Sequence, residues 1–143
     1  MVIHQLLTRV DLVPTSLALA QAASESAWGN SRFARQANNL FGQWCFSAGC
    51  GLVPLQRPQG MTHEVARYPS WQASVRAYLL NLNSHPAYQP LRDIRLDRRQ
   101  QNLPLSGELL AEGLEKYSAR GAIYVESLQQ IIRVNGLDRL DGI

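Results

Sequence analysis

A carboxylate at the end of an alanine-rich segment is the residue of this sequence best suited to chemistry. Glu25 follows residues 17–23, a nearly apolar run with the composition of a buried helix. Desolvation and the negative end of a helix dipole both raise the pKa of a carboxyl group in such a place. A carboxyl that keeps its proton near neutral pH can act as a general acid. The other interpretation is an ordinary exposed glutamate at a helix end.

The helix that carries Glu25 needs a start, an end and neighbours to hold it. Pro14 is tolerated in a first helical turn, and Thr15 or Ser16 can cap it, so we expect the helix to begin there. Gly29 predicts its end. Apolar periodicity and helix-breaking residues predict further helices over residues 3–9, 31–38, 107–117 and 122–134 and from Ser70 onwards.

Residues 43–68 have a different character, because glycine and proline recur through them. We interpret this segment as a small irregular β-lobe that carries a hairpin, with a strand over 62–68. Helical spacing places Trp71 in the core and Ile123 on the apolar face of the helix over 122–134. The prediction is one domain, residues 1–143, of the α+β class and mainly α, with a cleft between its lobes.

Two sequence blocks resemble a known enzyme family. Residues 19–31 read LAQAASESAWGNS and residues 38–42 read NNLFG. Together they resemble the signature of the glucosaminidase domain of glycoside hydrolase family 73, and they look closest to its Bax-like branch. The resemblance runs from about residue 13 to 135. It implies a lysozyme-like fold in which Glu25 is the catalytic acid and residues 38–42 support the floor of the cleft.

The resemblance also suggests further site residues. Some members use a second acidic residue on the β-lobe, and Glu64 is the candidate here, against the alternative of a solvated strand glutamate. Residues 116–128 resemble a paired-tyrosine block whose second member, Tyr124, lines the cleft, although Tyr124 could also serve packing alone. The residues expected to bind the glycan substrate are Trp28, Asn39, Phe41, Tyr68 and Tyr117. Trp44 could stack on a sugar or fill the small core of the lobe.

Cys45 and Cys50 are the only cysteines in the sequence. Four intervening residues, one of them glycine, can close a tight disulfide loop, which would indicate an oxidising compartment; two buried free thiols are the alternative. A metal site is not expected, because there is no second cysteine pair and the nearest histidine is His63. The expected chemistry needs no cofactor.

The charge of the chain is modestly positive, at +3, and Lys116 is the only lysine among fourteen basic residues. This balance suits an anionic polymer such as cell wall or nucleic acid, or reflects an arginine-rich proteome. Residues 92–99 lack the aromatic residues of a nucleic-acid platform, and we expect them to form a solvated surface. No run of apolar residues reaches the roughly 18 that a membrane helix needs, and the first residues do not read as a secretory signal.

The resemblance therefore implies an endo-β-N-acetylglucosaminidase that acts on peptidoglycan glycan strands. We expect it to be a monomer in the periplasm or cell envelope and not to bind nucleic acid. Glu25 would protonate the leaving oxygen. Glu64 would activate water, or the substrate acetamido group would attack with Tyr124 positioning it. With Glu25 and Glu64 on separate lobes, we expect too wide a gap for a nucleophilic Glu64. The alternatives are a lytic transglycosylase, a catalytically silent glycan-binding module, or an arginine-rich nucleic-acid binder.

Overall fold

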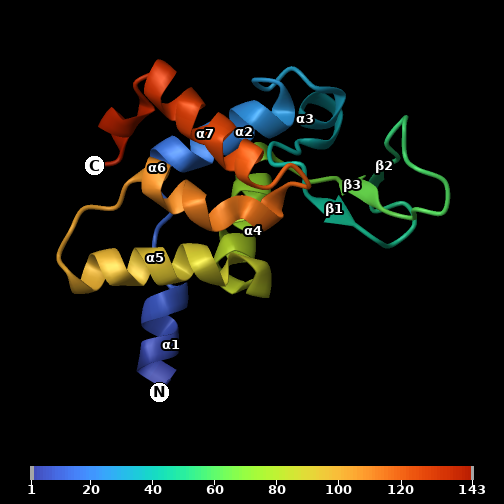
Figure 1. Ribbon diagram of the computed structural model, residues 1–143. Helices are drawn as coiled ribbons and strands as arrows, with labels where there is room; N and C mark the ends of the chain where they lie inside the picture. Colours follow the sequence, from blue (N-terminus) through green and yellow to red (C-terminus); the bar gives the residue numbers. More distant parts are fainter. Residues whose placement is uncertain (1, 143) are drawn as a thin grey trace. The chain divides into compact units, whose positions relative to one another are not determined.

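Helices dominate the computed structural model, which describes residues 2–142 (Figure 1). The α-helices are α1 (Val2–Arg9), α2 (Thr15–Ser26), α3 (Arg32–Ala37), α4 (Trp71–Ser84), α5 (Gln89–Gln100), α6 (Gly107–Leu110) and α7 (Ala122–Val134). The 3-10 turns are η1 (Pro86–Tyr88), η2 (Ala111–Tyr117) and η3 (Leu137–Leu140). With a small β-sheet, this confirms the predicted mainly α member of the α+β class.

The chain divides into two compact units, residues 22–78 and residues 1–21 with 79–143. The predicted β-lobe, residues 43–68, lies inside the first of these. Unit 22–78 also contains both Glu25 and Glu64, so the expectation that these two carboxylates belong to separate lobes was wrong.

The sheet of unit 22–78 has three short antiparallel strands rather than the expected hairpin. Their order is β1 (Trp44–Cys45), β3 (Glu64–Ala66) and β2 (Gly51–Leu52), so β3 is central, as the teal and green arrows of Figure 1 show. Trp44 pairs with Val65 and Gly51 pairs with Ala66. A Cβ atom on Gly51 would lie 1.9 Å from the carbonyl oxygen of Val65, so only glycine fits this close approach.

The helix that carries Glu25 ends three residues earlier than predicted. Helix α2 stops at Ser26, and Ala27, Trp28 and Gly29 then adopt positive φ angles of 50°, 58° and 81°. The hydroxyl of Ser26 donates to the Ala22 carbonyl oxygen and accepts from the Gly29 N–H. This left-handed turn places Glu25 in the last turn of the helix.

Unit 1–21 with 79–143 is built on helix α5, whose Leu91 is fully buried. A Cβ atom on Gly113 of η2 would lie 2.4 Å from the backbone of Leu91, so the missing side chain lets η2 and α5 approach closely. The predicted helix over 107–117 is divided into α6 and η2, with a non-helical residue at Leu114. Asp141 accepts from the N–H and hydroxyl of Ser16 and holds the first turn of α2.

The basic stretch 92–99 is not the solvated surface that its charge suggested, because Arg92 and Arg95 are both buried. Arg95 donates to the carbonyl oxygens of Thr8 at 2.8 Å and Leu12 at 3.1 Å, and so holds α1 against α5, as Figure 1 also shows. Arg92 donates to the carbonyl oxygen of Leu82 at 2.8 Å. Buried guanidinium groups are stable where backbone carbonyls satisfy their donors.

Two predicted core residues are on the surface. Trp71 is 51% exposed, and its Nε1 donates to the carbonyl oxygen of Ala34. Ile123 is also exposed, because α7 buries the neighbouring Tyr124 and Val125 instead.

Candidate active site

The carboxylate of Glu25 lies against the backbone of Gly42. Glu25 is half-buried, and a Cβ atom on Gly42 would lie 2.8 Å from Glu25 Oε2 and 3.5 Å from its Cδ. Gly42 has a φ of 70°, which glycine adopts without the cost that other residues pay. The fold therefore brings together the two blocks of sequence, 19–31 and 38–42, that carry the family resemblance.

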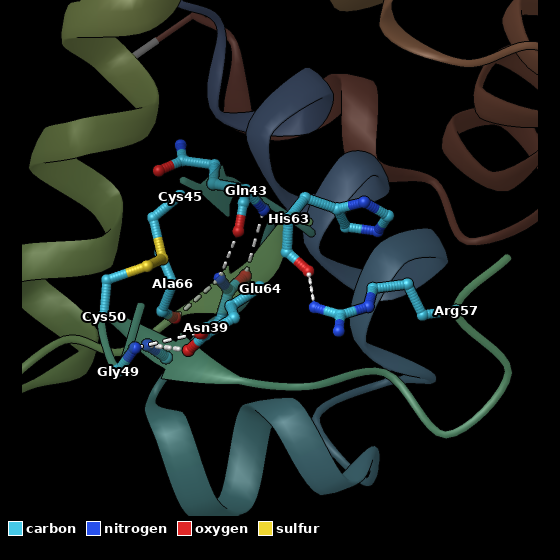
Figure 2. The surroundings of a disulfide bond; sticks show 10 residues. Asn39, Gln43, Cys45, Gly49, Cys50, Arg57, His63, Glu64 and Ala66 are labelled. Carbon is cyan, nitrogen blue, oxygen red and sulfur yellow. Dashed lines mark hydrogen bonds between the residues drawn. A yellow bond between two sulfur atoms is a disulfide. The ribbon is translucent and has the colours of Figure 1, made fainter. Parts of the chain in front are cut away.

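Asn39 holds the loop on which Gly42 lies. Its side chain is buried, and its Oδ1 accepts from the N–H of Gly42 at 2.8 Å and of Gln43 at 3.3 Å. Its Nδ2 donates to the carbonyl oxygens of Gln43 at 3.0 Å and Ala66 at 2.9 Å (Figure 2). Because the Ala66 bond reaches strand β3, one buried amide ties the loop to the sheet. Asn39 thus supports the site, and its polar atoms are used within the protein.

Two aromatic residues predicted near the glycan are integrated into unit 22–78. Phe41 is buried and stacks on Tyr78, with ring centroids 3.9 Å apart and planes 10° from parallel. Tyr68 is half-buried, and its hydroxyl donates to Oε1 of Gln43. Burial raises the pKa of Tyr68, so this phenol stays protonated as a donor.

Trp28 lies differently from these two rings. It is 63% exposed and follows Glu25 by three residues in the left-handed turn after α2. An exposed indole at this point is available to a ligand.

Glu64 anchors the disulfide loop. Cys45 and Cys50 form a disulfide, with Cα atoms 6.3 Å apart. The two carboxylate oxygens of Glu64 accept from the N–H groups of Gly49 and Gly51, each at 2.9 Å (Figure 2).

These two bonds also determine the charge state of Glu64. The backbone N–H groups of Gly49 and Gly51, in that order, and the nearby charge of Arg57 lower the pKa of Glu64. Glu64 is therefore a stable carboxylate that holds a loop, and it is a weaker base than an ordinary glutamate.

The tyrosine pair belongs to the other unit. Tyr124 on α7 is 2% exposed, and its hydroxyl accepts from Nε2 of the buried Gln21 at 3.0 Å. Tyr117 is half-buried, with its ring parallel to that of Tyr124 at a centroid distance of 5.9 Å and tilted against that of Tyr88 at 5.7 Å. The two tyrosines of the block thus stack on each other, whereas the prediction that Tyr124 lines the cleft stays a prediction.

Among residues 2–142, no cluster of three or more histidine, cysteine, aspartate or glutamate side chains could hold a metal ion. Within the same range, no helix is long and apolar enough to cross a membrane.

Comparisons with known proteins identify the class to which this fold and site belong. The glucosaminidase family model, described as mannosyl-glycoprotein endo-beta-N-acetylglucosaminidase, matches residues 2–137. The chain therefore belongs to the glucosaminidase family and has its mainly α, lysozyme-like fold. The description of the family model names a glycosidase activity on a glycan.

A curated relative is the protein Bax of Escherichia coli (strain K12), which is 39% identical over 121 residues. The match covers 85% of this chain and 42% of the relative, so the chain spans less than half of that protein. The predicted resemblance to the Bax-like branch is confirmed. No solved structure shows significant similarity to the chain.

Sequence reasoning missed several residues that build the site. One of them is Gly42, which ends the block 38–42 but whose contact with Glu25 is visible only in the folded chain. Gln21, one helical turn before Glu25, is a buried amide in an alanine-rich helix, and such a residue needs a hydrogen-bond partner. Nothing in the local sequence points to the partners of Glu64, because Gly49 and Gly51 donate through backbone atoms.

Proposed function

We propose that the chain hydrolyses the β-1,4 bond on the reducing side of N-acetylglucosamine in peptidoglycan, with Glu25 as the general acid. The observation that supports this most directly is the packing of the Glu25 carboxylate on Gly42. It brings the glutamate of one block to the glycine loop of the other, and the buried Asn39 holds that loop to the sheet.

In this mechanism the Glu25 carboxyl donates its proton to the glycosidic oxygen as the bond to the leaving sugar breaks. A half-buried carboxyl suits this role, because it reaches a ligand yet is partly shielded from water. Asn39 fixes the loop after Phe41 through hydrogen bonds to Gly42 and Gln43, and a fixed loop helps to keep the acid within hydrogen-bond distance of the oxygen that it must protonate.

The substrate itself is a better source of the group that attacks the anomeric carbon than a water molecule activated by Glu64. Both oxygens of Glu64 accept backbone hydrogen bonds, and the lowered pKa makes this carboxylate a poor acceptor for a proton from water. We therefore infer that the acetamido oxygen of the substrate attacks the anomeric carbon as the bond to the leaving oxygen breaks. Water then opens the resulting oxazolinium ion and gives its proton to the Glu25 carboxylate, which regenerates the acid. Glu64 stabilises the loop. That Tyr124 positions this group remains a prediction; in the structure its buried hydroxyl accepts from Nε2 of Gln21.

The test is digestion of purified peptidoglycan, with the fragments analysed by mass. Hydrolysis adds one water to each cleaved bond, and its products should carry N-acetylglucosamine at the new reducing end. Anhydro-muramyl ends would instead identify a lytic transglycosylase, and an unchanged polymer would identify a silent binding module.

Glu25→Gln should lower the rate by about 10²–10⁴-fold, because glutamine has nearly the same shape but no proton to donate. Its melting temperature should match that of the wild type. Glu126→Gln, at an exposed position of α7, is the control for loss of a carboxylate. Comparable activity in both variants would refute the role of Glu25.

A further inference from the structure

Trp44 presents an open aromatic surface beside the Gly42 loop. It lies on the edge strand β1 and is 53% exposed, so it does not fill a core. Two residues span at most about 7 Å of chain, so the Cα atom of Trp44 lies within that distance of the Gly42 Cα. The Glu25 carboxylate packs on the same Gly42. Trp44 therefore lies two residues beyond the glycine that contacts the proposed catalytic acid.

The indole of Trp44 is held in place although half of it is exposed. Its ring stacks on the imidazole of His63, with centroids 3.7 Å apart and planes 13° from parallel. His63 is itself buried, and Nη1 of Arg57 donates to its carbonyl oxygen at 3.0 Å (Figure 2). The neighbouring Cys45 is tied by the disulfide. A ring fixed in this way loses little conformational freedom when a ligand covers it.

We propose that Trp44, supported from behind by His63, is a stacking platform for one sugar ring of the glycan strand, in a subsite next to Glu25. The face of an indole is negatively polarised, and the C–H groups on one face of a pyranose ring are its natural partners. Such a contact needs no charge on the ligand, which suits the N-acetylglucosamine units of the strand. The inference rests on the proposed function, because it takes its ligand from it.

Binding can be measured without turnover in the Glu25→Gln protein. The probe is the β-1,4-linked tetramer of N-acetylglucosamine, titrated by calorimetry, with melting temperatures recorded for every variant. Adding Trp44→Ala should weaken binding by at least roughly tenfold, the scale expected for loss of one aromatic stacking contact. Trp44→Phe should restore most of the affinity, since a planar ring remains.

Trp71→Ala is the matched control, because Trp71 is 51% exposed and lies in the same unit but on helix α4. It should bind the tetramer as tightly as the Glu25→Gln parent. If Trp44→Ala lowers the melting temperature, Trp44→Leu keeps the apolar bulk without the planar face and should show the same loss of affinity.

The inference is overturned if Trp44→Ala or Trp44→Leu binds the tetramer like the parent, or if the parent does not bind it at all. Failure of the proposed function would give a different result in the peptidoglycan assay. A wild-type protein that leaves peptidoglycan intact, while its tetramer binding still depends on Trp44, would refute the hydrolase and retain the subsite.

Discussion

Replacing Gly42 by alanine separates the stability of the site loop from the placement of the Glu25 carboxylate. The φ angle of 70° at Gly42 is left-handed, and an alanine there costs about 1–2 kcal/mol of folding free energy. For a chain of this size that cost lowers the melting temperature by roughly 3–8 °C. The variant should therefore remain folded at ambient temperature.

The added methyl group would also displace the carboxylate of Glu25, the proposed acid. Its Cβ would lie 2.8 Å from Glu25 Oε2, so the oxygen must retreat by about 0.6 Å to reach the 3.4 Å at which ordinary contact begins. Rotation of the end of the Glu25 side chain has little effect on the free energy of unfolding. The same rotation should lower the rate of the reaction, since a misplacement of about 1 Å can lower a rate by roughly 10²-fold. We expect Gly42→Ala to lose about 10- to 100-fold in turnover.

The assay compares rates of peptidoglycan cleavage with melting temperatures for Gly42→Ala and Gly60→Ala. Gly60 has a similar left-handed φ of 86°, but a Cβ atom there meets nothing within 4 Å. Gly60→Ala should therefore lose similar stability and keep its activity. Equal activities in the two variants would show that the contact between Gly42 and Glu25 does not control the acid.

Three further predictions follow from buried or charged groups. Because its folded pKa is lowered, Glu64 contributes stability that is present above its ordinary pKa of 4.5 and is lost as the pH falls below it. The melting temperatures of wild type and Glu64→Gln should therefore converge at acidic pH, and the variant should keep its activity at neutral pH. A difference in melting temperature that does not change with pH would contradict this. Tyr124→Phe should cost about 1–3 kcal/mol in urea unfolding, because Gln21 loses its acceptor; lower turnover with unchanged stability would instead place Tyr124 in the cleft. Arg95→Met should cost about 3 kcal/mol or more, since backbone carbonyls lose their donor, whereas the exposed Arg76→Met should leave the unfolding midpoint unchanged.

The local pattern of residues was sufficient to predict the position of most helices. The segments that became α2, α4 and α7 were predicted from apolar spacing and capping residues, signals that neighbouring residues alone carry. Glu25 could be singled out because a carboxylate at the end of an apolar helix is unusual in itself. The β-lobe was located by its glycines and prolines, but its strand order was not, because pairing joins residues far apart in sequence.

The errors concern residues whose environment comes from elsewhere in the chain. Residues 92–99 read as a charged surface, yet Arg92 and Arg95 are buried, and carbonyl oxygens outside this stretch accept hydrogen bonds from their guanidinium N–H groups. Trp71 fits a helical apolar stripe but lies on the surface, since periodicity reports which face is apolar and not how far that face is covered. Side-chain type alone does not reveal either outcome.

The sequence by itself thus determined the helical class, the family and the identity of the candidate acid, because these depend on short contiguous blocks. Tertiary structure decided what surrounds that acid. Only the folded chain brings Gly42 to Glu25 and commits both oxygens of Glu64 to the disulfide loop. The physical reason is that backbone N–H groups and close approaches have no signature in residue type, and they exist only once distant segments have packed.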